Sequence, residues 1–160
     1  MTLTAEDVDP LALERQVCFA LAATNRAVLA LYRPLLEPLG LTHPKYLVML
    51  VLWDHQKISP STSLSVKKIA STLQMDSATL SPMLKRLESL GLISRARNAT
   101  DERSTDVTLT DKGLALRERA LEIPEKVVAR LGMSLAELER VHEVLTRLNA
   151  AAVRGGALQS

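Results

Sequence analysis

SATLSPMLKRLESLG, running from Ser77 to Gly91, is the stretch that decides the fold of this 160-residue chain. Asp76 or Ser77 can cap a helix at its start, and Gly91 is placed to end that helix. Just upstream, Ser65 can cap a shorter helix over Val66–Leu73. Two short helices joined by a tight turn predict a helix-turn-helix. The apolar positions of the second helix share one face: Leu80, Met83, Leu84, Leu87 and Leu90.

Two extended runs follow this unit, Leu92–Arg97 and Ser104–Thr110, and a polar segment separates them. Val107 and Leu109 point to one face and Thr108 points to the other, which is the alternation of a half-buried strand. The pattern predicts a β-hairpin, or wing, directly after the helix-turn-helix.

Upstream of residue 65, the sequence predicts two helices and a loop. Asp9 can cap a first helix that begins with Pro10 and runs to about Leu36. Thr42 or His43 can open a second helix through Pro44, whose residues 46–53 should be buried nearly all round. Residues 55–63 contain a proline and several serines, which favour a loop.

Downstream of the wing, two more helices are expected. Thr110 can cap a helix that continues past Pro124 with a kink and fades near Gly132. Ser134 and Glu137 have the spacing of a capping box, which predicts a last helix ending near residue 153. The fold class is therefore mainly α (α+β), as one domain over residues 1–160. Its expected parts are dimerisation helices at 10–40 and 111–153, and a winged helix-turn-helix at 41–110 with its wing at 92–110.

Composition sets limits on the class of protein. Hydrophobic residues make up 47% of the chain and aromatic residues only 2%, which suits helix-on-helix packing. The longest apolar run, residues 46–53, is too short to span a bilayer. A single cysteine allows no internal disulfide and fits a reducing compartment. We therefore expect a cytoplasmic protein with no membrane partner, no metal and no cofactor.

Charge is more informative locally than over the whole chain. The net charge is only +2, yet residues 65–103 contain seven basic and four acidic side chains. In a helix-turn-helix, the N-terminal end of the second helix enters the major groove, and a basic wing suits the minor groove. The sequence thus predicts binding to double-stranded DNA at an inverted-repeat operator. The expected DNA-binding residues are Ser77, Thr79, Ser81, Lys85, Arg86, Arg95, Asp101 and Arg103.

The ordered series of helix, turn, helix and basic hairpin resembles the MarR family of bacterial regulators. The residues that carry the likeness are SATLSPMLKRLE from Ser77, GLI from Gly91, and DERS and VTLT between Asp101 and Thr110. The resemblance implies a homodimeric, winged-helix transcription regulator. Family members of this kind are regulators rather than enzymes.

Within that family the chain is most similar to the OhrR type, repressors that respond to organic hydroperoxides. The matching segments are QVCFAL around Cys18, LYRPLL around Tyr32, and LTHPKYLVMLVLW from Leu41. The resemblance implies that Cys18 is the peroxide-reactive thiol and that Tyr32 is a hydrogen-bond partner. His43 stands where familiar members have a second tyrosine. With one cysteine, oxidation should pass through a sulfenic acid and a mixed disulfide with a small cellular thiol.

Helix geometry constrains how Cys18 and Tyr32 can meet. They are 14 residues apart, so within one helix they share a face but lie roughly 21 Å apart. They can approach each other only between two subunits. We therefore expect the sensor in the dimer interface.

Two other functions are open at this point. One is a MarR-type regulator that responds to a small-molecule ligand rather than to thiol oxidation. The other is a thiol enzyme, such as a peroxidase, that uses Cys18 with His43 as its base. The enzyme reading is the weaker one, because it leaves the recognition helix and the wing unexplained.

Overall fold

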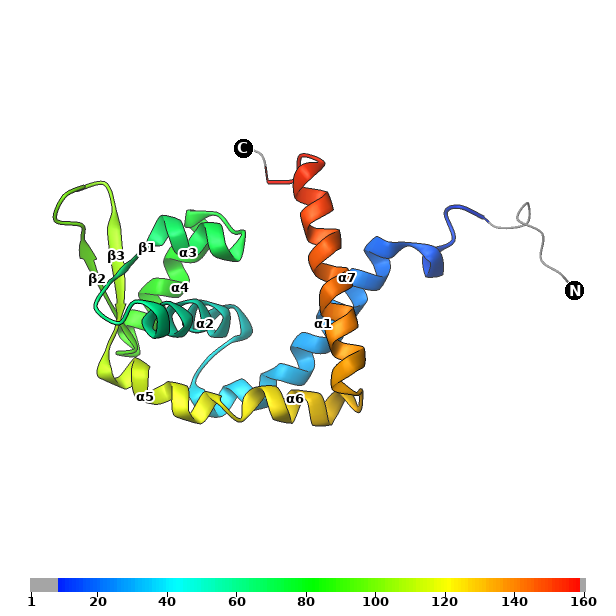
Figure 1. The fold of residues 1–160 in the computed structure, drawn as a ribbon, viewed down its shortest axis with the longest axis horizontal. Helices are drawn as coiled ribbons and strands as arrows, with labels where there is room; N and C mark the ends of the chain where they lie inside the picture. Colours follow the sequence, from blue (N-terminus) through cyan, green and yellow to red (C-terminus); the bar gives the residue numbers. More distant parts are fainter. Residues whose placement is uncertain (1–8, 159–160) are drawn as a thin grey trace, which may run out of the picture.

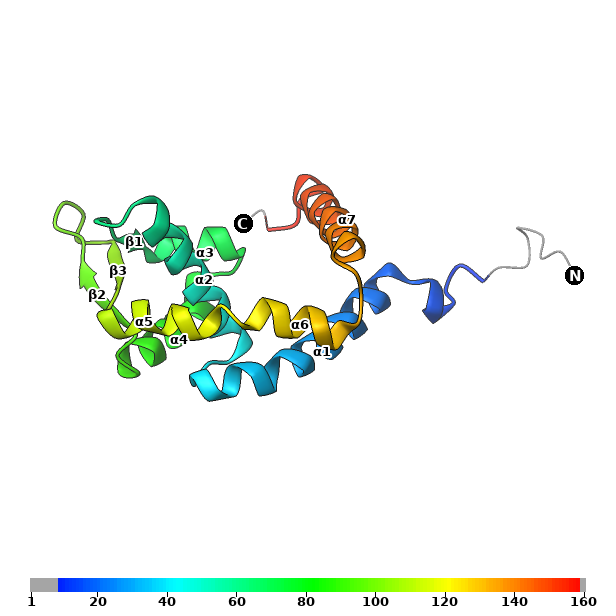
Figure 2. The ribbon, with the colours of Figure 1, turned by 60° about the horizontal axis from the view of Figure 1, so that its bottom comes forward.

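The computed structural model describes residues 9–158. A winged head, residues 43–110, lies at one end, and two arm helices, Val17–Leu36 and Leu135–Arg154, lie at the other (Figure 1). Two short helices, α5 and α6, follow one another along one edge and join the two ends (Figures 1 and 2). In chain order the elements are 3₁₀ turn η1 Leu13–Arg15, α1 Val17–Leu36, 3₁₀ turn η2 Glu37–Leu39, α2 His43–Ile58, β1 Leu64–Ser65, α3 Val66–Leu73, α4 Ser77–Ser89, β2 Ile93–Arg97, β3 Thr105–Leu109, α5 Asp111–Ala120, α6 Ile123–Leu131 and α7 Leu135–Arg154.

The helix-turn-helix is confirmed, with both of its expected caps. The Ser65 hydroxyl accepts a hydrogen bond from the Lys68 amide at 3.1 Å, which starts α3. The Asp76 carboxylate accepts from the Thr79 amide at 2.6 Å, which starts α4. Gly91, with φ of +74°, follows the end of α4 in the left-handed conformation that glycine adopts at little cost.

The wing is also confirmed, and it belongs to a slightly larger sheet than expected. Strands β2 and β3 pair antiparallel, with Arg95 opposite Val107. Strand β1 pairs with the other edge of β3, so the order is β1-β3-β2. The sequence did not predict β1, because two residues are too few to show an alternating pattern.

The core lies where α2, α3, α4 and the sheet meet. Leu80, Leu84 and Leu87 on α4 are fully buried, as the sequence predicted. The Trp53 indole N–H donates to the Gly113 carbonyl oxygen at 2.9 Å and ties α2 to α5. A Cβ atom at Gly113 would stand 2.1 Å from the Leu92 carbonyl oxygen, so this packing requires glycine.

The expected start of the first helix is wrong. The Asp9 carboxylate accepts from the Leu11 amide and forms a local turn instead of capping a helix. A single 3₁₀ turn follows, and Gln16 is extended, with φ of −80° and ψ of 120°. Helix α1 therefore begins at Val17 rather than Pro10, and it ends at Leu36 as expected.

Two other boundaries also differ from the prediction. Helix α2 continues to Ile58, so the loop covers residues 59–63 rather than 55–63. Pro60 explains the end, because the residue before a proline is disfavoured in helical conformation. The expected kink at Pro124 is instead a break: α5 ends at Ala120, and Pro124 lies in the first turn of α6, where its missing N–H costs nothing.

Helix α7 is confirmed with its complete capping box. The Ser134 hydroxyl accepts from the Glu137 amide, and the Glu137 carboxylate accepts from the Ser134 amide. None of the residues of α7 is buried, although the helix has an apolar stripe. Within residues 9–158, none of the helices combines the length and the hydrophobicity needed to cross a bilayer.

Candidate functional site

The first turns of α4 present small hydroxyl side chains to solvent. Ser77, Thr79 and Ser81 are all exposed to solvent. Hydrogen bonds from the Thr79 backbone and side chain hold the pKa of the Asp76 carboxyl below its usual value. Lys85 and Arg86, one to two turns further on, are also exposed. The sequence-predicted residues of this helix are thus together and accessible.

A network of short hydrogen bonds shapes the tip of the wing. The Asn98 side-chain oxygen accepts from the Thr100 amide, the Thr100 hydroxyl and the Asp101 amide. Asp101 in turn accepts from the Arg103 backbone amide at 3.0 Å. Asp101 therefore orients the backbone of Arg103 and leaves its exposed guanidinium unbound within the described chain.

Arg95 has a partner that the sequence did not reveal. Its backbone amide and its guanidinium both donate to the Glu88 carboxylate, at 3.1 and 3.2 Å. The Arg95 side chain is only 26% exposed, and its bond to Glu88 holds the pKa of that carboxyl below its usual value. The sequence predicts Arg95 as a DNA-binding residue, and the structure shows that it also joins β2 of the wing to the last turn of α4.

Cys18 lies in the first turn of α1 and is exposed. Its apolar neighbours Val17, Phe19 and Leu21 are exposed as well. Tyr32 lies on the same helix, so the rise of about 1.5 Å per residue still separates it from Cys18 by roughly 21 Å. One chain alone does not bring the thiol and the phenol together.

Tyr32 instead belongs to an aromatic cluster with His43 and Tyr46. The ring centroids of Tyr32 and His43 are 5.1 Å apart in an edge-to-face arrangement, and those of Tyr32 and Tyr46 are 6.1 Å apart. Partial burial raises the pKa of Tyr32, and it lowers the pKa of His43. Burial therefore favours the neutral imidazole of His43, which can donate at one nitrogen and accept at the other.

Tyr46 is the member of this cluster that sequence reasoning missed as a functional residue. It was predicted only as part of a buried helix, and it is indeed 5% exposed. Burial, together with Tyr32 nearby, raises its pKa. Its position at the start of the apolar run 46–53 gave no signal of a role beyond packing.

A hollow of about 440 Å³ opens beside the aromatic cluster. It has a cation, Arg33, and an acid, Glu37, on the α1 side, and His43 on the α2 side. The remaining lining is Leu29, Gly40, Leu41, Thr42 and Pro44. Among the described residues, no three histidine, cysteine, aspartate or glutamate side chains are placed to hold a metal ion.

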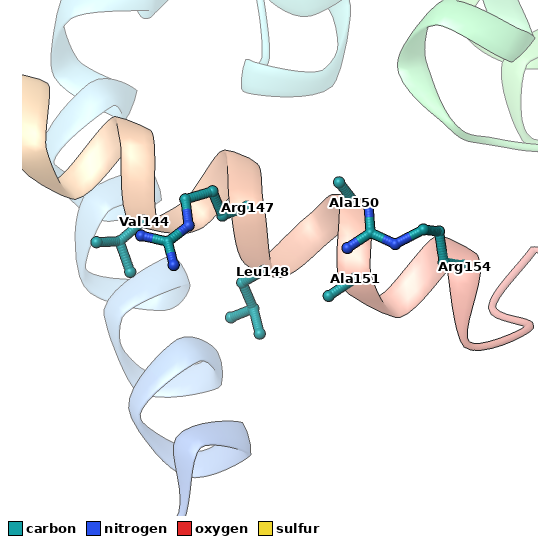
Figure 3. A pocket seen from close by; sticks show the side chains of 6 residues that line it. All are labelled: Val144, Arg147, Leu148, Ala150, Ala151 and Arg154. Atoms are coloured by element: carbon teal, nitrogen blue, oxygen red, sulfur yellow. The ribbon is translucent and has the colours of Figure 1, made fainter.

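The two arm helices carry uncovered apolar side chains. Figure 3 shows Leu148 and Ala151 projecting from the same side of α7, with Val144 one turn earlier, in a shallow hollow flanked by two arginines. The larger exposed apolar residues of this helix are Leu135, Val141, Val144, Leu145 and Leu148.

Comparison with known proteins assigns the fold and the family. The model of the transcriptional regulator SarA/Rot family matches residues 30–119, which contain the complete head. The organic hydroperoxide resistance transcriptional regulator of Bacillus subtilis (strain 168) is 41% identical over 140 residues, which are 88% of this chain and 91% of that protein. The chain belongs to the MarR family. It is a winged-helix, DNA-binding transcription regulator of the same type as that Bacillus protein.

Other MarR-family relatives agree with this assignment. The HTH-type transcriptional regulator TtmR of Methylorubrum extorquens (strain PA1) is 45% identical over 86% of this chain and 67% of its own length. Reduced AbfR bound to DNA superimposes with a TM-score of 0.74 at 30% identity, over 89% of this chain and 93% of AbfR. Residues 9–158 thus have the architecture of a family member that has been seen on DNA.

Proposed function

We propose that this MarR-family chain is a homodimeric repressor that binds an inverted-repeat operator and releases it when an organic hydroperoxide oxidises Cys18. One observation carries the proposal: Cys18 is exposed on an uncovered apolar face of α1, and Tyr32 lies on the same helix. The chain shares 41% identity with a regulator named for organic hydroperoxide resistance.

The uncovered apolar faces support a dimer. Large contiguous apolar surfaces on a soluble protein mark sites of association. Both α1 and α7 have such a face, and a twofold partner would cover them. If the two α1 helices cross antiparallel, Cys18 of one subunit comes near Tyr32, His43 and Tyr46 of the other.

The sensing chemistry needs only this thiol, the hydroperoxide and a cellular thiol. The Cys18 thiolate attacks the outer oxygen of the hydroperoxide, the O–O bond breaks, and the alkoxide takes a proton and leaves as an alcohol. The sulfur is now a sulfenic acid. A small thiol then attacks that sulfur, so that a mixed disulfide forms and water leaves. Each event modifies one subunit, so the chain acts as a switch and not as an enzyme.

The aromatic cluster has a defined part in this scheme. A phenol O–H from Tyr32 or Tyr46 can donate a hydrogen bond to the thiolate, and hydrogen bonds to charged groups are worth about 1.5–3 kcal/mol. His43 is neutral, so it helps by hydrogen bonding rather than by its charge. A sulfenic acid or a mixed disulfide is larger than a thiolate, which would push the two α1 helices apart.

Operator binding with and without oxidant tests this function directly. Fluorescence anisotropy on an inverted-repeat operator should show release when cumene hydroperoxide is added. The Cys18→Ser variant should bind with wild-type affinity and stay bound. Mass spectrometry of the wild type should show one added oxygen on Cys18 before a thiol is supplied. Equal release of both proteins would rule out Cys18 as the sensor.

The hollow beside His43 favours a second candidate, a regulator that responds to a bound small molecule. Arg33 at its rim suits a carboxylate, and the apolar lining suits a hydrocarbon or aromatic group. Titration of reduced protein with aromatic carboxylates distinguishes the two mechanisms. Release under reducing conditions, unaffected by Cys18→Ser, would favour ligand binding over oxidation.

A further inference from the structure

Two amide side chains far apart in the sequence form a closed pair between the head and an arm. The Gln74 amide nitrogen donates to the Asn149 side-chain oxygen at 2.9 Å. The Asn149 amide nitrogen donates back to the Gln74 side-chain oxygen at 2.8 Å. Gln74 ends α3 and Asn149 lies on α7, so this pair connects the helix-turn-helix to the C-terminal arm.

This contact is notable because α7 makes few other contacts with the rest of its own chain. None of its residues is buried, and its other side-chain hydrogen bonds are local: the Ser134–Glu137 capping box, and the Thr146 hydroxyl donating to the His142 carbonyl oxygen. Among residues 9–158, the Gln74–Asn149 pair supplies the only side-chain hydrogen bonds between α7 and another element. The relative position of the head and this arm therefore depends on it.

The position of Gln74 makes the contact effective. Its backbone is left-handed, with φ of 54° and ψ of 43°, an unusual conformation for a residue other than glycine or asparagine. Two residues later, Asp76 caps α4. One short turn thus connects Gln74 to the start of α4, the predicted recognition helix. A displacement of Gln74 would also displace the start of that helix.

We propose that Gln74 and Asn149 are positioning residues that set the separation of the two recognition helices and thereby select the spacing of operator half-sites. The inference rests on the proposed dimeric repressor. In a twofold dimer, two copies of this pair fix both heads relative to the shared arms. Two helices that enter the major groove must match half-sites one helical turn apart, so small changes in their separation alter which operator fits.

The expected energy of the pair suits this role. An intramolecular hydrogen bond makes only a modest net contribution, because exposed amides exchange easily with water. Losing the pair should leave the fold intact. It should weaken binding to the preferred operator about three- to tenfold, since the heads must then be fixed by the DNA alone.

A set of variants distinguishes the effect of the Gln74–Asn149 pair from the effects of neighbouring residues. Asn149→Ala removes one partner, and Gln74→Asn shortens the other while keeping a residue that accepts left-handed backbone. The double variant Gln74→Asn with Asn149→Gln exchanges the two side chains and keeps their combined length. His142→Ala is the matched control, because it lies two turns before Asn149 on the same face of α7.

Each protein is assayed by anisotropy on operators whose half-site spacing changes in single base-pair steps. The wild type and His142→Ala should share one preferred spacing. Each single variant should lose affinity at that spacing about three- to tenfold and discriminate less between spacings, and the exchanged pair should recover both. Unchanged affinity and spacing preference in the single variants would overturn the inference. Failure of the wild type to bind any inverted repeat would instead overturn the proposed function.

A second measurement reports on geometry without DNA. A spin label on Thr100→Cys in the Cys18→Ser background measures the distance between the two wing tips. Asn149→Ala should broaden that distance distribution, and the exchanged pair should narrow it again. If the Asn149→Ala variant gives a distance distribution as narrow as that of the protein with Gln74 and Asn149 intact, the inference is also contradicted.

Discussion

The ring of Tyr32 meets the ring of His43 edge to face, with centroids 5.1 Å apart, and joins α1 to the first turn of α2. This contact places the proposed sensor at the point where an arm helix turns into the DNA-reading head. In the proposed dimer, a displacement of α1 caused by a modified Cys18 would act on these two rings, alongside the contacts that Leu36 makes in the core.

Replacing Tyr32 should therefore slow sensing while sparing DNA binding. Tyr32→Phe keeps the ring and removes the hydroxyl that can donate to the sulfur. We expect oxidant-induced release to slow about tenfold or more, from the loss of a hydrogen bond to a charged group. Stopped-flow anisotropy after addition of cumene hydroperoxide measures this rate. Release at the wild-type rate would exclude Tyr32 from the sensor, and Tyr46→Phe tests the second phenol in the same assay.

The pH dependence of stability should change when His43 is replaced. Burial lowers the pKa of His43 in the folded state, so the unfolded chain binds a proton more readily as pH falls below about 6.5. Wild-type stability should therefore fall as pH drops through that region, and His43→Gln should flatten this part of the profile. Urea unfolding at pH 7.5 and 5.5, at one protein concentration, gives the comparison. Parallel profiles for the two proteins would show that burial does not lower the pKa of His43 in the folded state.

Replacing Glu88 tests whether its ion pair with Arg95 fixes the position of the wing. Removing an acid near DNA ordinarily strengthens binding, because it lowers repulsion of phosphate. Glu88 instead anchors Arg95, so Glu88→Ala should weaken operator binding about three- to tenfold by freeing the base of the wing. Arg95→Ala should produce a similar loss. Tighter binding by Glu88→Ala would show that Arg95 acts on DNA directly and not through this ion pair.

Arg103 and Lys85 should have distinguishable effects. Arg103→Ala should cost about 1–3 kcal/mol at the preferred operator if the guanidinium reads the groove. Lys85→Ala should weaken binding to all sequences and reduce the slope of affinity against salt by about one. Both side chains are exposed, so neither change should alter the unfolding temperature. Wild-type affinity in both variants would argue against this docking face.

Gly113 should not tolerate a side chain. Gly113→Ala would place a methyl group 2.1 Å from the Leu92 carbonyl oxygen and disturb the bond from Trp53. Overpacking of this kind costs about 1–3 kcal/mol or more. Chemical denaturation measures the loss, and Gly155→Ala, where the nearest atoms are 3.4 Å away, is the control. Equal stability of the two variants would show that the backbone at residue 113 can yield.

Features that depend on local chemistry were predictable from the sequence. Ser65, Asp76, Thr110 and Ser134 all cap the helices expected of them, because a cap acts within three residues of itself. The start of α1 was not, since Asp9 can satisfy a backbone amide equally well in a turn.

The candidate site divides in the same way. The hydroxyl side chains of α4 and the basic wing tip followed from the order of elements. The Glu88–Arg95 and Gln74–Asn149 contacts did not, because pairs of ordinary surface residues acquire meaning only when the fold brings them together. Tyr46 was read correctly as buried, and only its distance from Tyr32 connects it with the sensor.

None of the residues of helix α7 is buried, so in the proposed dimer the ordering of the arms would be a second-order event. The melting temperature of such a protein rises with its concentration. Dilution of the proposed dimer would loosen the arms before it affected the heads. An operator that binds two heads raises their local concentration, so operator binding and dimerisation favour each other.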